Sequence, residues 1–311
     1  MTFAEALHSE QFVVTAELSP PRGADGEAVR RAAAILRDWV DAANITDNQG
    51  AVMRMSSLAG SYLALQAGVE PVMQLVCRDR NRMALQSDLL GAGALGIPNV
   101  LLLTGDHPRF GDHPEARAVF DLDSVQLIWL ARTMRDRAET LSGKKLTIAP
   151  RLLIGCVENP FAPPLRFRAE RLAKKVAAGA DFVQTQYIFD VKVFERWIDE
   201  SRELGLLTRC AVLAGIGPIR SMRALERMRQ IPGIVIPDEI ERRLRSVPSD
   251  RVFDESVNIC CELIAELRSI SGVRGIHIMA FGNEEAVPLI LERSNVGDRE
   301  ARSLRPRAAV R

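Results

Sequence analysis

An acidic side chain, Glu17, lies within an otherwise apolar run from Val13 to Leu18. Alternate residues of an extended strand point to the same face, so Glu17 and Thr15 point the same way. A carboxylate buried among apolar residues is costly unless it is paired or used. Desolvation raises its pKa toward neutrality, as a general acid working near neutral pH requires. The alternative is a structural ion pair with Arg22 or another cation, and residue type alone does not choose between them.

A second carboxylate, Asp106, follows the apolar run Asn99 to Leu103 and the short turn Thr104-Gly105. Glycine lets the backbone approach a flat ligand closely, with Asp106 beside it. Next to a flavin, such a carboxylate would disfavour the anionic reduced ring and modulate hydride transfer. The alternative is that Asp106 caps the turn. The connection Pro108 to Asp121 is long for a link between a strand and a helix, and such loops commonly cover ligands.

Two glutamines, Gln184 and Gln186, alternate along one apolar run and therefore share a strand face. An amide offers both donors and an acceptor, which suits the edge of a pterin or flavin ring. The alternative is a hydrogen bond to the backbone at the strand end.

Other kinds of chemistry lack their sequence signals. The chain contains no nucleophile elbow, P-loop or HExxH motif, so hydrolase and kinase activities have no support. His107 and His113, with their aspartate neighbours, match no metal-ligand spacing, so no metal is expected.

Whole-chain composition narrows the partners. Forty-one basic and 40 acidic residues give a net charge of +1, so no overall field attracts nucleic acid or a membrane surface. The five cysteines form no CxxC pattern, which indicates a reducing compartment. Neither a signal sequence nor an apolar run of membrane-spanning length is present. These features predict a cytoplasmic protein whose partners are small molecules.

Short apolar runs alternate with segments of helical periodicity, which is the pattern of repeated β/α units. The predicted strands are Phe12 to Leu18, Ala42 to Thr46, Pro71 to Cys77, Asn99 to Leu103, Leu146 to Cys156, Asp181 to Gln186, Cys210 to Ile216 and Val273 to Met279. Helical segments separate and follow them, and an extra helical pair, Pro237 to Arg245 and Asp250 to Ser269, precedes the eighth strand.

Eight such units favour closure into an eight-stranded parallel β/α (TIM) barrel, in which the site lies at the carboxyl ends of the strands. An open doubly wound sheet is less favoured because no GxGxxG follows the first strand. We expect one catalytic domain over residues 1–292 and an Arg-rich C-terminal tail over residues 293–311.

Several motifs, taken in order, resemble the methylenetetrahydrofolate reductase family from about Phe12 to Glu292. They are Ala16 to Arg22, Asn44 to Asp47, Leu103 to Asp106, Ala178 to Phe182 with Thr185 to Asp190, and Gly275 to His277. The resemblance implies a β/α barrel that passes a hydride from NADH or NADPH through FAD to 5,10-methylenetetrahydrofolate. The product is 5-methyltetrahydrofolate, and the reverse oxidation would serve methyl-group catabolism.

The resemblance also implies individual roles. Glu17 matches the acid that assists opening of the folate ring, Asp106 matches a carboxylate near flavin and pterin, and Gln186 matches a folate contact. Gln184 and His277 are predicted with Gln186 as substrate-binding residues. The residues expected to bind the cofactor are Thr46, Gln74, Thr104, Gly105, Asp106, His107, Glu158 and Lys175.

The chain departs from the better-known family members on the flavin side. Thr104 stands in place of an arginine and Gln74 in place of a histidine. Arg168 and Arg171 stand where acidic or amide residues are expected. FMN, or direct hydride transfer without a flavin, are therefore alternatives to FAD. A folate- or flavin-binding accessory subunit, a homo-oligomer and a folate-dependent methyltransferase-type barrel also remain open.

Overall fold

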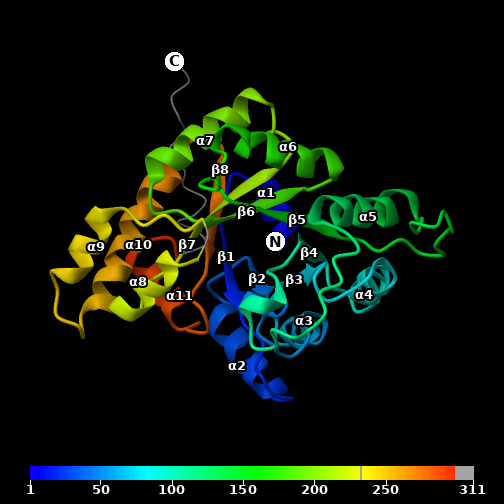
Figure 1. Cartoon of the computed structure of the whole chain (residues 1–311), viewed down its shortest axis with the longest axis horizontal. Helices are drawn as coiled ribbons and strands as arrows, with labels where there is room; N and C mark the ends of the chain where they lie inside the picture. The colour runs from blue at the N-terminus through cyan, green and yellow to red at the C-terminus, as the bar shows by residue number, and fades with distance from the viewer. Residues whose placement is uncertain (232, 298–311) are drawn as a thin grey trace.

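Eight parallel strands close into a barrel in which each strand pairs with the next along the chain and β8 pairs with β1 (Figure 1). The structure is a computed structural model that describes residues 1–231 and 233–297. The strands are β1 (Val13–Leu18), β2 (Ala42–Ile45), β3 (Pro71–Val76), β4 (Asn99–Leu103), β5 (Leu153–Glu158), β6 (Phe182–Tyr187), β7 (Ala211–Ile216) and β8 (Val273–Ile278). The predicted β/α barrel is confirmed.

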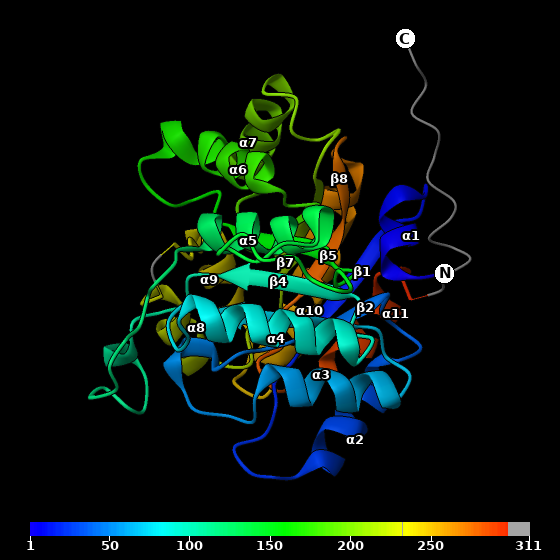
Figure 2. The same cartoon turned by 90° about the vertical axis from the view of Figure 1, so that its right-hand side faces the viewer.

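Helices surround the strands (Figure 2). They are α2 (Gly26–Leu36), α3 (Ser57–Gln66), α4 (Arg82–Ala94), α5 (Ser124–Arg137), α6 (Arg168–Ala178), α7 (Val191–Glu203), α8 (Met222–Arg229) and α11 (Ala286–Arg293). The predicted extra pair is present as α9 (Asp238–Arg245) and α10 (Val252–Ser269), directly before β8. Local signals begin several of these helices; at α5, for example, Asp123 and Gln126 form a reciprocal capping box.

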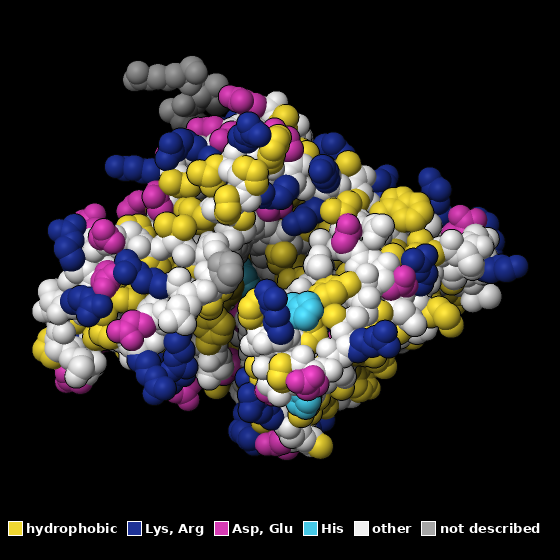
Figure 3. All heavy atoms as spheres, viewed as in Figure 1, with side chains coloured by type: hydrophobic (Ala, Val, Ile, Leu, Met, Phe, Trp, Pro, Cys, Tyr) yellow, Lys and Arg dark blue, Asp and Glu magenta, His cyan; other side chains and the backbone are white. Residues whose placement is uncertain are grey.

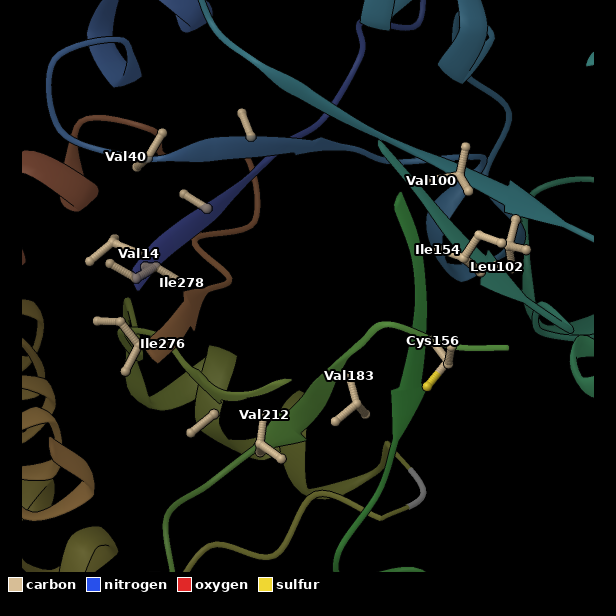
Figure 4. Packing of buried hydrophobic residues seen from close by; sticks show 14 of the residues in the cluster. Val14, Val40, Val100, Leu102, Ile154, Cys156, Val183, Val212, Ile276 and Ile278 are labelled. Atoms are coloured by element: carbon tan, nitrogen blue, oxygen red, sulfur yellow. The ribbon is translucent and has the colours of Figure 1, made fainter. Parts of the chain in front are cut away.

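The main apolar core lies between the strands and this ring of helices. Val14, Ile154, Val183, Val212 and Ile276 are all 0% exposed and are spaced around the barrel (Figure 4). Because alternate strand residues face opposite ways, this outward layer leaves the inward positions available for a polar site.

One strand is shifted from its predicted position. The apolar residues from Leu146 onward predicted a strand ending at Cys156, but β5 spans Leu153–Glu158. Ile148 is instead 82% exposed in the preceding connection, so its apolar character misled the sequence interpretation. The shift makes Glu158 the last residue of β5 rather than part of the loop after it.

A short helix that the sequence analysis did not predict, α1 (Phe3–His8), closes the amino end of the barrel (Figure 2). Phe3 is completely buried, and its ring meets the edge of the Phe182 ring at 5.2 Å. The Phe3 N–H also donates to Glu70. With six residues, α1 is too short to give a periodicity signal and depends on these tertiary contacts.

The end of the described chain packs against the barrel. Helix α11 ends at Arg293, and Val296 is 1% exposed. Most of the expected Arg-rich tail, residues 298–311, lies outside the described residues. Within the described ranges, no helix combines the length and the apolar character needed to cross a membrane.

The buried contact between α1 and β6 predicts a large stability effect. Phe3→Ala should lower the free energy of unfolding by about 3–5 kcal/mol, because it leaves a cavity at the amino end of the barrel. Urea unfolding measures this effect. Phe110→Ala is the matched control, since Phe110 is 67% exposed; equal losses in the two variants would contradict the role assigned to α1.

Candidate active site

The inward polar side chains of four strands form one hydrogen-bonded chain across the barrel. They are Thr15 on β1, Asn44 on β2, Gln184 on β6 and His277 on β8, each no more than 3% exposed. The Gln184 amide nitrogen donates to Thr15 Oγ1 at 3.1 Å and to Asn44 Oδ1 at 3.0 Å. Asn44 Nδ2 donates back to Gln184 Oε1 at 2.6 Å. The two amides therefore satisfy each other and leave the Thr15 hydroxyl hydrogen free to donate.

This hydrogen-bonded chain ends on the Nδ1 atom of His277. Thr15 Oγ1 lies 2.9 Å from His277 Nδ1, closer than its 3.4 Å contact to the Ile276 carbonyl. Donation from the Thr15 hydroxyl to the nearer acceptor, Nδ1, corresponds to the tautomer with the ring proton on Nε2. Burial lowers the pKa of His277 to about 3, so the ring is neutral at physiological pH.

Glu17 lies beside His277, at the end of this hydrogen-bonded chain that is nearer the barrel mouth. Its Oε1 is 4.0 Å from His277 Nε2, which is not an ion pair because the imidazole is neutral. Glu17 is 7% exposed, and burial raises its pKa to about 7, although hydrogen bonds from Gln49 and Gln74 act in the opposite direction. The carboxyl group is therefore ready to donate a proton near neutral pH.

The alternative interpretation of Glu17, an ion pair with Arg22, is not observed. Arg22 is exposed and lies 3.8 Å from Asp112 instead. The partners of Glu17 are neutral: Gln49 Nε2 donates to its two oxygens at 3.2 and 3.1 Å.

Sequence reasoning missed Gln49, which lies on the single-turn helix η1 (Gln49–Ala51) after β2. Asn48, Gly50 and Ala51 around it have positive φ values of 47°, 65° and 59°. Left-handed conformations are unfavourable for residues with a side chain and persist where the surroundings enforce them. The Asn-Gln-Gly sequence indicates a turn, but only the fold shows that this turn aims Gln49 at Glu17.

Asp106 stands at the mouth, with its backbone held in place. Its carbonyl accepts from Arg78 Nη1 at 3.2 Å, and Gly105 has a φ of 89° that packs the turn against Val76 and Arg78. Arg78, only 3% exposed, also pairs with Asp79 at 2.7 Å. This buried guanidinium therefore positions the turn, and the Asp106 residue that follows is exposed.

The long connection after β4 folds over the loop that carries Gln49. Its Asp112 side chain accepts from the Met53 N–H at 3.0 Å, and Gly111 packs so closely on Ala51 that a Cβ there would overlap the Ala51 carbonyl. Figure 3 shows the surface of this face hollowed at its centre. The connection thus forms one wall beside the mouth.

The remaining predicted site residues are dispersed. Gln186 is the residue before the last of β6, and its Oε1 accepts from the Tyr187 N–H, whereas Gln184 is 1% exposed within the barrel. Thr104 accepts from the Ser124 N–H, and the exposed His107 accepts from Arg109. The Thr46 hydroxyl is completely buried and has no hydrogen-bond partner in the described part of the chain.

The cations on the expected flavin side are already engaged. Lys175 donates to the Val157 carbonyl and to Glu158, with 3.0 Å separating Nζ from the Glu158 carboxylate. Arg168 donates from Nε and Nη2, one edge of its guanidinium, to the two carboxylate oxygens of Glu200 at 3.0 and 2.9 Å. Arg171 donates to Glu158 and to the Ala162 carbonyl.

A flavin adenine dinucleotide needs available cations or backbone donors for its diphosphate. The three cations at the expected positions are instead satisfied by neighbouring protein oxygens. These three side chains therefore do not fit the diphosphate of a bound FAD.

Comparison with known proteins agrees with this fold. The sequence model of the family described as methylenetetrahydrofolate reductase matches residues 2–295, and the chain belongs to this family. Methylenetetrahydrofolate reductase 2 of Saccharomyces cerevisiae is 28% identical over 277 residues, covering 85% of this chain and 42% of the yeast protein. The chain thus spans about two fifths of the length of this eukaryotic relative.

A bacterial relative, the 5,10-methylenetetrahydrofolate reductase of Pectobacterium carotovorum, is 22% identical over 278 residues and is matched over 86% of its length, with 88% of this chain covered. Other relatives carry NADPH or NADH in their names. Among solved structures, a Clostridium thermocellum protein described as binding two copies of 5-methyl-5,6,7,8-tetrahydrofolic acid has a TM-score of 0.66 at 14% identity. The match covers 95% of this chain and 100% of the clostridial one, and at this identity it shows the fold alone.

Glu17→Gln should change how stability depends on pH. Because the pKa of Glu17 rises from 4.5 to about 7 on folding, the folded wild type holds the proton more tightly than the unfolded chain. Its stability therefore falls between these pH values, by up to about 3 kcal/mol, and falls no further above them. The variant cannot titrate, so its stability relative to wild type should increase by that amount over the same window.

Urea unfolding across this pH range measures the difference. Glu115→Gln, on the exposed connection after β4, controls for the loss of one negative charge. A difference between Glu17→Gln and wild type that stays constant with pH would show that burial does not raise the Glu17 pKa.

Thr15→Val should break the hydrogen-bonded chain while keeping the side-chain shape. The variant leaves the buried His277 Nδ1 without its donor, which should cost about 1–3 kcal/mol of stability. Histidine ¹⁵N NMR should show the Nε2–H form in wild type and in the Thr15→Ser control, and a changed pattern only in Thr15→Val. The same histidine spectrum in all three proteins would contradict the hydrogen bond from Thr15 to His277.

Proposed function

We propose that this protein reduces 5,10-methylenetetrahydrofolate to 5-methyltetrahydrofolate with a hydride from NADH or NADPH. The observation that carries the proposal is the buried Glu17 carboxyl, whose pKa is raised to about 7 at the mouth of a barrel of this family. The names of several relatives support a nicotinamide co-substrate.

The chemistry requires one proton and one hydride. In the substrate a methylene carbon bridges two folate nitrogens, N5 and N10, and in the product it is a methyl group on N5. The bond from carbon to N10 must therefore break, with a proton passing to N10 and the remaining N5 iminium accepting the hydride. The dihydronicotinamide loses that hydride and becomes the oxidised aromatic ring, so electrons and atoms balance.

Glu17 is the proton donor in this proposal. With a pKa of about 7, its protonated form delivers the proton to N10 as that bond breaks. Burial without a cationic partner keeps this pKa raised, although the hydrogen bond from Gln49, which orients the carboxyl group, favours the carboxylate. Gln184 and Thr15 do not contact Glu17 in this proposal. Gln184 donates to Thr15, and Thr15 contacts the Nδ1 atom of His277.

Asp106 and Gln186 are assigned to the folate in this proposal. The Asp106 carboxylate can accept from the amino and ring N–H groups of a pterin, and it also favours the cationic iminium electrostatically. Gln186, at the end of β6, offers an amide to the same ring. Since the residues on the flavin side do not fit FAD, we assign the hydride directly to the nicotinamide rather than to a flavin.

Glu17→Gln should lower the rate of folate-dependent NAD(P)H oxidation by about 10²–10⁴-fold, because it removes the proton donor but keeps the side-chain shape. In wild type, the single-turnover rate should fall as the pH rises above about 7, where Glu17 loses its proton. Stopped-flow absorbance of the reduced nicotinamide measures both effects, with folate binding and melting temperature as controls for folding.

Two results would contradict the proposal. The absence of turnover with either nicotinamide, even after addition of FAD or FMN, would exclude the reaction. A yellow purified protein with stoichiometric, catalytically required FAD would instead retain the reaction and overturn its direct-transfer form. The visible absorption spectrum distinguishes these outcomes from the expected colourless, active enzyme.

A further inference from the structure

A cavity of about 440 Å³ opens at the mouth between α2 and the connection from β8 to α11. This volume falls within the range of small-molecule sites. The cavity is lined by Ser19, Pro21, Ala28, Ala32, Gln49, Arg54, Phe281, Gly282 and Glu284. In the closed order of strands, the elements that line it flank β1, while Asp106 and Gln186 lie on the far side of the barrel, at β4 and β6.

The cavity and the proposed proton donor share one side chain. Gln49 lines the cavity and also donates to both oxygens of Glu17, at 3.2 and 3.1 Å. A ligand in the cavity is therefore separated from the Glu17 carboxyl by no more than this amide.

The walls suit a flat ring. Ala28 and Ala32 lie one turn apart on α2, so they present the same small apolar face to the cavity. Phe281 provides an aromatic surface; it is 44% exposed and has a φ of 47°. The Phe281 ring lies 5.9 Å from the Tyr187 ring at a tilt of 30°, and its remaining exposed surface can stack on a flat ligand.

The cavity also contains an unpaired cation and an unpaired anion. Arg54 Nη1 donates to the Pro20 carbonyl at 3.0 Å, and Arg54 has no carboxylate partner among residues 1–231 and 233–297. Glu284 likewise has no cationic partner in that part of the chain, and Arg54 does not pair with it. A ligand that offers an acceptor to Arg54 and a donor to Glu284 would satisfy both groups.

We infer that this cavity binds the dihydronicotinamide ring of NADH or NADPH, an inference that rests on the proposed function. The carboxamide has one oxygen acceptor and an NH₂ donor group, which match Arg54 and Glu284. The ring packs between the two alanines and Phe281. The hydride donor must approach the carbon whose bond Glu17 helps to break, and the cavity lies beside Glu17. A p-aminobenzoylglutamate tail suits it less well, because its carboxylates would meet Glu284.

Filling the cavity tests this assignment. Ala32→Leu adds apolar volume to the wall and should weaken NADH and NADPH binding by about tenfold or more, measured by the fluorescence of the reduced nicotinamide without folate present. Binding of 5-methyltetrahydrofolate, measured by calorimetry, should change by less than about twofold. Ala34→Leu, on the exposed face of the same helix, is the matched control and should change neither.

Phe281→Ala provides a second variant that does not depend on burial, and it should weaken the nicotinamide by removing the stacking surface. Weaker folate binding with unchanged nicotinamide binding in Ala32→Leu would overturn the assignment, as would unchanged binding of both ligands in a correctly folded variant. A wild type that binds NADH at this cavity but never reduces folate would keep the assignment and exclude the proposed reaction. If the wild type is active and both variants bind the nicotinamide as wild type does, the assignment of this cavity is overturned and the proposed reaction is kept.

Discussion

The removal of one carboxyl group from water is the constraint on which the barrel mouth depends. Glu17 is surrounded by Gln49, Gln74 and a neutral His277, so it receives hydrogen bonds but no compensating charge. A cation in any of these positions would stabilise the carboxylate and lower its pKa. The uncharged character of this polar layer is therefore a condition for proton donation near neutral pH.

Two buried charge pairs lie at the same end of the barrel, outside that layer. The buried Arg78 pairs with Asp79, and Arg80 pairs with the buried Asp47 at 2.7 Å. These pairs connect the loops after β2, β3 and β4, since Arg78 also donates to the Asn48 and Asp106 carbonyls. The basic side chains therefore stabilise the loops that carry the site and place no positive charge next to Glu17.

Part of this arrangement could be predicted from the sequence. An acid inside an apolar run identified Glu17, and eight alternating segments identified the barrel. The role of Gln49 could not be predicted, because it depends on a strained turn that aims the side chain across to β1. Helix α1 is too short for a periodicity signal, and the partner of Arg168, Glu200, lies 32 residues further along the chain, where only the fold brings it close.

Closure of the amino end by α1 has a kinetic consequence. Below the polar layer, the barrel interior is filled by apolar residues that include Val13, Leu101 and Leu213, and Phe3 seals the end. This apolar filling leaves the mouth as the route by which Glu17 exchanges protons with solvent. In the proposed reaction, a ligand that covers the mouth would therefore have to leave before the acid regains its proton from bulk water.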